Sequence, residues 1–270
     1  MSAETVAKKQ TSVFFKRKRN VAVVFTVCLV LYLVTAGAVN FDFGGAVLSI
    51  PAAFAWLGNN IIPNESSMEQ FPNIIDRLIE TALLSVAVTI FAAIAAFFSS
   101  LLGTKTLKFN FLLAKSVRMI AAIFRSIPEV VWAILLLFSF GQNIMTGFFA
   151  LFFTTYGMLT RAFIEAIDEV SADCVEALEA TGSTTLQLVF QGIWPSSITL
   201  IITWVLYMIE TNIRAATLIG LLTGTGIGAL FHMFYSRMNF NAAMLVIAST
   251  AVLVVIIETT ANQIRKVILK

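Results

Sequence analysis

The sequence is poor in the residues that build metal centres and covalent frameworks. It has one histidine and two cysteines in 270 residues, and His232 has no second histidine and no cysteine near it. Structural metal sites need several such ligands at short spacings, and disulfide-rich domains need paired cysteines. Cys28 lies in an apolar run and Cys174 in a polar one, so we expect no bridge between them. The sequence therefore predicts no metal site, no disulfide and no cofactor.

Charge is also scarce. Asp, Glu, Lys and Arg make up 12% of the residues, whereas hydrophobic residues make up 59%, with 24 phenylalanines, and the mean hydropathy is +0.90. A soluble domain is about half apolar and about a quarter charged. The composition predicts an integral membrane protein in contact with lipid, and it gives no indication of a nucleic-acid partner.

Six apolar runs are each long enough to cross about 30 Å of hydrocarbon as a helix. They are too long and too uniformly apolar for barrel strands, and isolated strands would leave backbone groups unsatisfied in lipid. We therefore expect an all-α integral membrane fold with six transmembrane helices. The runs lie near residues 20–40, 79–102, 119–140, 144–162, 196–219 and 241–261.

The positions of Lys and Arg predict the orientation of the chain, because basic residues concentrate in cytoplasmic loops. The tail 1–19 and the last segment, 265–270, are both basic, so we expect both termini in the cytoplasm. The loop 41–76 has no Lys or Arg and is expected outside. Within it, residues 43–63 are apolar but interrupted by Pro51, which favours a position along the outer membrane surface. A cleavable signal peptide is the alternative for the first run, and it would leave the later orientations unchanged.

A polar segment joins the fourth and fifth runs, and alternation places it in the cytoplasm. Its acidic residues recur every three or four positions, with apolar residues at other angles, which predicts one two-faced helix. Gly182 is suited to end this helix with a positive φ, and Pro195 can occupy the first turn of the next helix. An acidic helix face is in general typical of a solvated hairpin. The acidic residues are Glu165, Asp168, Glu169, Asp173, Glu176 and Glu179.

The stretch EALEATGSTTLQLVFQGIWP, residues 176–195, resembles the signature loop of ABC-importer permeases, which reads E-A-A, three residues, Gly, nine residues, I-x-L-P. The resemblance implies a type I importer permease fold over residues 77–264, in which the loop 165–195 docks on a cytoplasmic ATPase. It also implies an external substrate-binding protein and a second permease subunit, identical or different, as partners. The pattern is matched at Glu176, Ala177, Gly182 and Pro195, and the sequence departs from it at Leu178, Gly192 and Trp194.

Two further stretches look most like phosphonate-import permeases. They are FRSIPEVVWAILLLFSFG at residues 124–141 and ETNIRAATLIGLLTGTGIG at residues 210–228. This resemblance implies phosphonate as the cargo, with phosphite or phosphate close to it. Related permeases for methionine and other small solutes also carry a glycine-rich run here, so they remain an alternative, and a binding protein usually selects the cargo.

Polar residues follow one side of the fifth run at intervals of three or four, which favours a pore or a packed bundle. Thr203 and Tyr207 in this row are candidates for the translocation pathway. Charged side chains inside membrane helices usually face a partner or a water-filled path, so Glu210 and Arg214 are candidates either for the translocation pathway or for a simple i, i+4 ion pair. Arg125 and Glu129 are a second candidate pair for the pathway, on either side of Pro128, whose missing N–H favours a kink in the third run. The polar residues of the fifth run are Ser196, Thr199, Thr203, Tyr207, Glu210, Arg214 and Thr217.

The glycines of GTGIG, Gly224, Gly226 and Gly228, follow no strand and do not indicate a dinucleotide site. They favour a tight turn or a close helix approach between the last two spans. The sequence also has no G-x-x-x-x-G-K-[ST] motif, so we expect that another subunit hydrolyses ATP and that this chain is not itself an enzyme.

An ion-coupled secondary carrier is the rival interpretation, and it predicts broken helices in two inverted halves, a symmetry that the sequence lacks. A membrane-embedded enzyme would need a cluster of histidines or acids, and the intramembrane acids are scattered.

Overall fold

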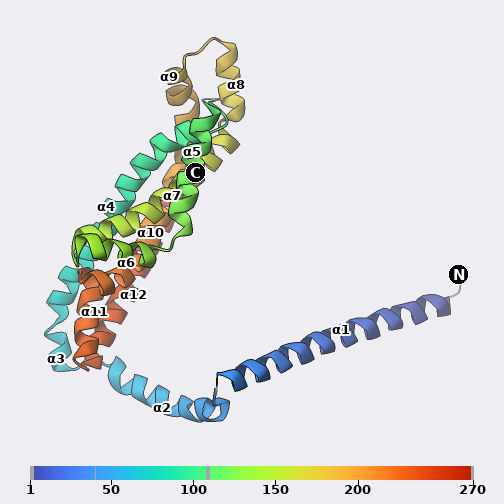
Figure 1. Cartoon of the computed structure of the whole chain (residues 1–270), viewed down its shortest axis with the longest axis vertical. Helices are drawn as coiled ribbons and strands as arrows, with labels where there is room; N and C mark the ends of the chain where they lie inside the picture. The colour runs from blue at the N-terminus through green and yellow to red at the C-terminus, as the bar shows by residue number, and fades with distance from the viewer. Residues whose placement is uncertain (1–2, 40, 108–109, 269–270) are drawn as a thin grey trace. The chain divides into compact units, whose positions relative to one another are not determined.

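The computed structural model describes residues 3–39, 41–107 and 110–268, and every regular element in these residues is a helix (Figure 1). The expected all-α class is therefore confirmed. The chain divides into two compact units, residues 1–59 and 60–270. Each unit is described by itself.

The first unit contains α1 (Ala3–Ala38) and most of α2 (Phe43–Ile61). The stretch Arg17–Ala38 of α1 is long and apolar enough to cross a membrane, and it coincides with the first expected span. α2 is not among the helices that meet this criterion; it contains Pro51 and has no buried residue. The expected loop 41–76 is thus helical over much of its length.

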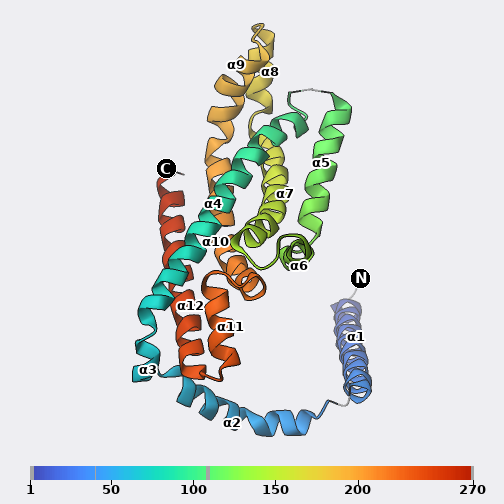
Figure 2. The same cartoon turned by 60° about the vertical axis from the view of Figure 1, so that its left-hand side comes forward.

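The second unit is built around α4 (Phe71–Gly103), α7 (Ile144–Val170) and α10 (Trp194–Thr223), which pack against one another (Figure 2). The expected domain boundary at residue 77 falls inside α4. The other elements are arranged around these three helices. They are α3 (Glu65–Met68), α5 (Phe111–Ser126), α6 (Glu129–Phe140), α8 (Ala172–Ala180), α9 (Thr185–Gln187), the π-helical segment η1 (Leu188–Ile193), α11 (Gly226–Ser236) and α12 (Phe240–Ile268).

Small residues line the contacts between the central helices, as is usual where helices pack in lipid without a hydrophobic driving force. The buried face of α4 includes Ser85, Thr89, Ala92, Ala96 and Ser100. The buried face of α7 includes Thr146, Gly147, Ala150, Thr155 and Gly157. These short side chains let the backbones approach closely.

A buried amide joins all three central helices. Asn212 of α10 donates from Nδ2 to the hydroxyl of Thr89 on α4 at 2.8 Å and to the hydroxyl of Thr155 on α7 at 2.9 Å. The hydroxyl of Ser85 lies 3.2 Å from the main-chain oxygen of Asn212 and donates to it. All four residues are buried. Because an unsatisfied polar group is costly in an apolar interior, the network favours one register of the three helices.

The third expected span, 119–140, contains the kink expected at Pro128, as a sharp bend between two helices. α5 and α6 meet at an angle of 90°, so the described residues contain five helices able to span a membrane, or six if this bent pair counts as one span. Pro128 has no N–H and disfavours helical backbone at the preceding residue, and Ile127 is extended, with φ −96° and ψ 120°. The indole of Trp132 instead donates to the Phe124 carbonyl at 3.3 Å.

Replacing Asn212 by alanine is expected to lower the free energy of unfolding by about 1–2 kcal/mol, because it removes two interhelical hydrogen bonds that each contribute about 0.6–1 kcal/mol in a membrane protein. The measurement is an unfolding titration in mixed detergent micelles followed by circular dichroism. Thr211→Val is the matched control, since within the described part of the chain the hydroxyl of Thr211 bonds only to the Tyr207 carbonyl of its own helix. An equal loss of unfolding free energy in the two variants would contradict the stabilising role of the Asn212 hydrogen bonds.

Candidate functional site

The segment between α7 and α10 forms a helical hairpin. α8 ends in a turn in which Gly182 has φ +80°, and the amide of Gly182 donates to the Glu179 carbonyl at 3.0 Å. α9, η1 and α10 then lead back without a break, and Pro195 lies in the first turn of α10. Figure 1 shows this hairpin, α8 and α9, at the end of the second unit. Four of the residues singled out from the sequence are exposed here: Glu176, Ala177, Gly182 and Pro195.

An apolar cluster anchors the base of the hairpin. Val175 of α8 is buried with Leu188 and Ile193 of η1, against Ile167 of α7 and Leu107. The bend that follows α7 makes this cluster possible, because it turns Val175 back toward Ile167. The hairpin is therefore exposed at its tip and fixed at its base.

Two departures from the signature pattern have structural roles at this base. A side chain at Gly192 would approach Leu178 to 3.0 Å, so the absence of one lets α8 lie close against η1. Trp194 packs edge-on against Phe97 of α4, with ring centroids 5.3 Å apart.

The expected single acidic helix is wrong, because the chain bends at Ser171 and divides the acidic residues between α7 and α8. Ser171 is buried and ends α7, and its amide donates to the Ile167 carbonyl at 3.1 Å. Glu165 and Glu169 are exposed on α7, whereas Asp168 is not part of a solvated face.

Asp168 binds the loop between α4 and α5. Its Oδ1 atom accepts hydrogen bonds from the amides of Lys105 at 2.9 Å and Thr106 at 3.3 Å, and from the hydroxyls of Thr104 and Thr106. Its Oδ2 atom lies 3.4 Å from Nη2 of Arg118, whose Nε donates to the Gly103 carbonyl at 2.8 Å. One carboxylate thus attaches α4, the following loop and α5 to α7.

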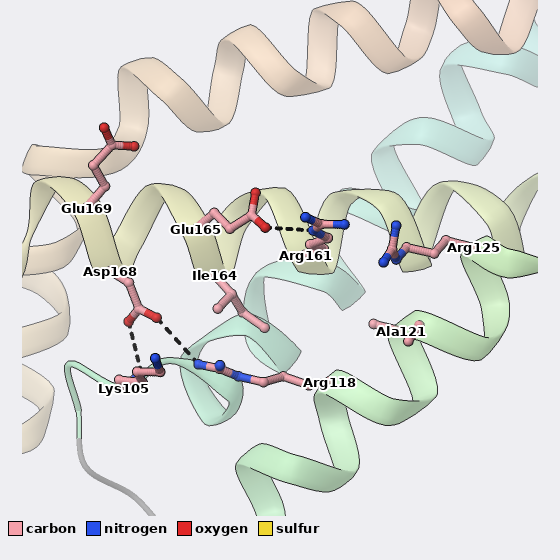
Figure 3. Close-up of a pocket in the computed structure, with 10 residues that line it drawn as sticks. Lys105, Arg118, Ala121, Arg125, Arg161, Ile164, Glu165, Asp168 and Glu169 are labelled. Carbon is pink, nitrogen blue, oxygen red and sulfur yellow. Dashed lines mark hydrogen bonds and ion pairs between the residues drawn. The ribbon is translucent and has the colours of Figure 1, made fainter.

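A cavity of about 570 Å³ lies beside this carboxylate, between α5, α7 and Lys105 (Figure 3). Four of its residues are cationic and three are acidic. Arg161 and Glu165, one turn apart on α7, form an ion pair with Nε and Oε1 2.6 Å apart. The lining residues are Lys105, Arg118, Ala121, Ala122, Arg125, Arg161, Ile164, Glu165, Asp168 and Glu169.

The charged residues of α10 form an ion pair, with Nη1 of Arg214 and Oε1 of Glu210 3.0 Å apart. The Glu210 side chain is 12% exposed and that of Arg214 is 50% exposed. Arg265 approaches the second carboxylate oxygen at 4.0 Å. Because Arg265 belongs to α12, the expected tail 265–270 begins inside a helix that packs on α10.

The structure separates the other pathway candidates. Thr203 is half-buried and donates to the Thr199 carbonyl of its own helix, whereas Tyr207 is exposed beside Trp204. No ion pair joins Arg125 and Glu129 in the described residues. Arg125 lines the cavity from α5, whereas Glu129 begins α6 beyond the bend, where a carboxylate interacts favourably with the helix dipole.

The family of binding-protein-dependent transport system inner membrane components has a model that matches residues 89–268, more than half of the chain. The chain belongs to this family. It is an ABC importer permease, a multi-pass membrane protein, and the type I permease fold expected from the signature loop is confirmed.

Several known proteins are similar to this permease. HtxC of Stutzerimonas stutzeri, which is named for a phosphite transport system, is 26% identical over 254 residues, 94% of this chain and 89% of that protein. PhnE2 of Escherichia coli strain K12, named for a cryptic phosphonate transport system, is 29% identical over 117 residues, 43% of this chain and 96% of that protein. A chain of the MetNI methionine ABC transporter in an inward-facing conformation shares the fold, with a TM-score of 0.65, 18% identity and coverage of 76% and 99% of the two chains.

The three glycines of the permease that follow α10 form a compact corner. Gly224 ends α10 with φ +69°, and Gly226 starts α11 with φ +57°. The amide of Gly226 donates to Oε1 of Glu80 at 3.2 Å, which ties the corner to α4. Gly228 packs directly against the backbone of α10, where any side chain would meet the Thr217 carbonyl.

Sequence reasoning missed Asp168 and Asn212 as organising residues of the permease. The spacing of the acidic residues places Asp168 on a solvated helix face, and the apolar run 196–219 gives Asn212 no predicted role. The available signals are a lone amide within a span and a carboxylate near the end of a span, and both become specific only when their long-range partners are known.

Asp168→Ala is expected to lower the free energy of unfolding of the permease by about 2–3 kcal/mol, the scale for losing hydrogen bonds to a charged group. The amides of Lys105 and Thr106 should also exchange hydrogen faster, because both lose their acceptor. Mass spectrometry of hydrogen exchange measures this directly. Glu169→Ala, the exposed neighbour on the same helix, is the control and should leave both quantities unchanged; slow exchange of those amides in Asp168→Ala would refute the assigned role.

Proposed function

We propose that this permease carries phosphonates, or the related oxyanions phosphite and phosphate, into the cell, and that a separate cytoplasmic ATPase drives it. Two permease subunits form the path, and an external binding protein delivers the cargo. The observation that carries the proposal is the exposed helical hairpin between α7 and α10, with the signature spacing from Glu176 to Pro195.

The form of the hairpin supports coupling to a motor subunit. Its tip is exposed, so it is available to a groove on another protein, and short helices are often recognised in this way. Its base is fixed by the cluster around Val175, and Asp168 ties α7 to the loop before α5. A displacement of the hairpin tip would therefore move α4, α5 and α7 together. In this proposal the hairpin and both chain termini face the cytoplasm.

The position of Arg214 supports a second subunit or a water-filled path beside α10. At 1.5 Å per residue, Arg214 lies about 30 Å from the start of α10 and about 14 Å from its end. Its side chain is half exposed, and a guanidinium at this depth is costly against lipid. Contact with a partner subunit or with hydrated cargo avoids that cost, and the Glu210 carboxylate limits how tightly an anion is held, as release requires.

The names of similar proteins support the choice of cargo. HtxC and PhnE2 are named for phosphite and phosphonate transport, respectively. The stretches 124–141 and 210–228 resemble phosphonate-import permeases, and each contains a cationic residue that could attract an anion. Arg125 lines the cavity, and Arg214 belongs to α10.

Gly182→Val should reduce ATP-driven uptake to background. A β-branched residue is strained at φ +80°, although nothing lies within 4 Å to obstruct its side chain. Gly182→Asn is the informative companion, because asparagine tolerates this backbone conformation, and it should retain much of the uptake. Both are compared in proteoliposomes that contain the complete transporter. Normal uptake by the valine variant would count against the hairpin as the coupling element.

Uptake of methylphosphonate into proteoliposomes should require ATP, the ATPase and the binding protein, and should be insensitive to a protonophore. Phosphite and phosphate are tested as competitors, and methionine serves as the control solute. Accumulation by the permease alone, driven by an ion gradient, would contradict the proposal and support a secondary carrier. Preferential uptake of methionine would refute the assigned cargo while leaving the ATP-driven mechanism in place.

A further inference from the structure

The cavity between α5 and α7 contains an arginine without a counter-ion. Arg125 extends from α5 and has no hydrogen bond or ion pair among the described residues, although it is only partly exposed. Figure 3 shows its guanidinium directed toward the same space as that of Arg161 on α7. Arginine is seldom left unpaired in a partly buried setting, because its five N–H donors seek acceptors.

The acidic residues of the cavity are already engaged or distant. The carboxylate of Asp168 accepts four hydrogen bonds at one oxygen and pairs with Arg118 at the other. Glu165 pairs with Arg161 through one oxygen. Glu169 is exposed and lies at the end of the cavity farthest from Arg125 in Figure 3. The half of the cavity between Arg125 and Arg161 therefore holds two guanidinium groups and the one carboxylate of Glu165, a formal charge of +1.

The backbone fixes this half of the cavity. At Gly157, α7 approaches α5 so closely that an added side chain would come within 2.7 Å of the Ala121 carbonyl and the Arg125 amide. This contact sets where Arg125 leaves α5. The short side chains of Ala121 and Ala122 then leave the space beside it open. The two guanidinium groups thus reach one space from two helices whose backbones are in close contact at Gly157.

We propose that this cavity binds a small tetrahedral oxyanion of the phosphate class, held between the guanidinium groups of Arg125 and Arg161. Two planar guanidinium groups from different helices suit a tetrahedral anion, because each can donate two parallel hydrogen bonds to a pair of its oxygens. The cavity of about 570 Å³ accommodates inorganic phosphate or a small phosphonate with its water. The choice of a phosphorus anion rests on the proposed function, whereas the anion site itself rests on the cavity.

The bound anion would connect α5 to the part of α7 that leads into the hairpin. Arg161 lies on the same helix as Asp168, and that helix ends at Val170, next to α8. The site is therefore placed on the hairpin side of the permease, where it would meet cytoplasmic phosphate, released cargo or the phosphate of a lipid headgroup. All three present the same chemistry to the two arginines.

The test uses the full-length permease in nanodiscs of phosphatidylcholine, titrated with inorganic phosphate and methylphosphonate by calorimetry. Arg125→Gln should weaken binding of both at least about tenfold, the scale for losing hydrogen bonds to a charged group. Arg125→Lys should weaken anion binding less, because the positive charge remains but the planar guanidinium with its paired donors is lost. Ala122→Leu should also weaken it, since it fills the space and leaves every charge in place.

Arg237→Gln is the matched control, because Arg237 is an exposed arginine in the turn after α11 and should leave the affinity unchanged. A thermal unfolding scan of each variant verifies the fold, which is expected to tolerate Arg125→Gln because no partner is orphaned. Nanodiscs with phosphatidylglycerol identify the source of the anion. If native mass spectra show a lipid that the native protein retains and Arg125→Gln loses, the site binds lipid headgroups. This result supports the proposed oxyanion chemistry.

Equal phosphate affinity and equal lipid retention in the native protein and Arg125→Gln would overturn the site. Because this titration contains no ATPase and no binding protein, its result is separate from the uptake measurements. Suppose that Arg125→Gln loses phosphate binding and that the complete native transporter takes up no phosphonate. The oxyanion site is then supported, and phosphonate as the transported solute is refuted. Normal uptake together with unchanged affinity would keep the cargo and refute the site.

Discussion

The side-chain amide of Asn212 is the interaction on which the arrangement of this permease depends. It is the one buried amide side chain in the described residues, and it bonds to α4 and α7 from α10. Apolar helix faces in lipid can slide past one another at little cost in free energy, because lipid tails and apolar side chains are similarly apolar. A directional hydrogen bond between three helices removes that freedom. The small residues around it then allow the close contacts that dispersion forces reward.

α7 connects this rigid centre with the exposed parts of the molecule. At one level it contributes Thr155 to the amide network, and further along it contributes Arg161 to the cavity and Asp168 to the α4–α5 loop. At Ser171 it passes into the hairpin. A force on the hairpin therefore acts on a helix that is bonded to its neighbours at several heights, which favours concerted movement over local bending.

The sequence predicts those features whose cause is local. Long apolar runs predict the spans, and the interval from Glu176 through Gly182 to Pro195 predicts the hairpin, because turn and helix-start preferences reside in single residues. Pro128 offered a local signal for the bend, but hydrophobic length alone does not distinguish one straight span from two short helices at 90°. The partners of Asp168 and Asn212 lie at least 50 positions away in the chain, so neither periodicity nor spacing could identify them. The cavity likewise depends on how Gly157 sets α5 against α7.

The bend at Pro128 also supplies an optical reporter. The indole of Trp132 donates across the bend to the Phe124 carbonyl and packs against the rings of Phe124 and Phe153, with centroids 5.7 Å and 4.9 Å away. Straightening of the α5–α6 pair separates the indole from both rings and exchanges its acceptor, and each change alters the emission of tryptophan. The chain has three other tryptophans, Trp56, Trp194 and Trp204. With those three replaced by phenylalanine, the fluorescence of Trp132 reports any change in the angle of this joint, without any attached dye.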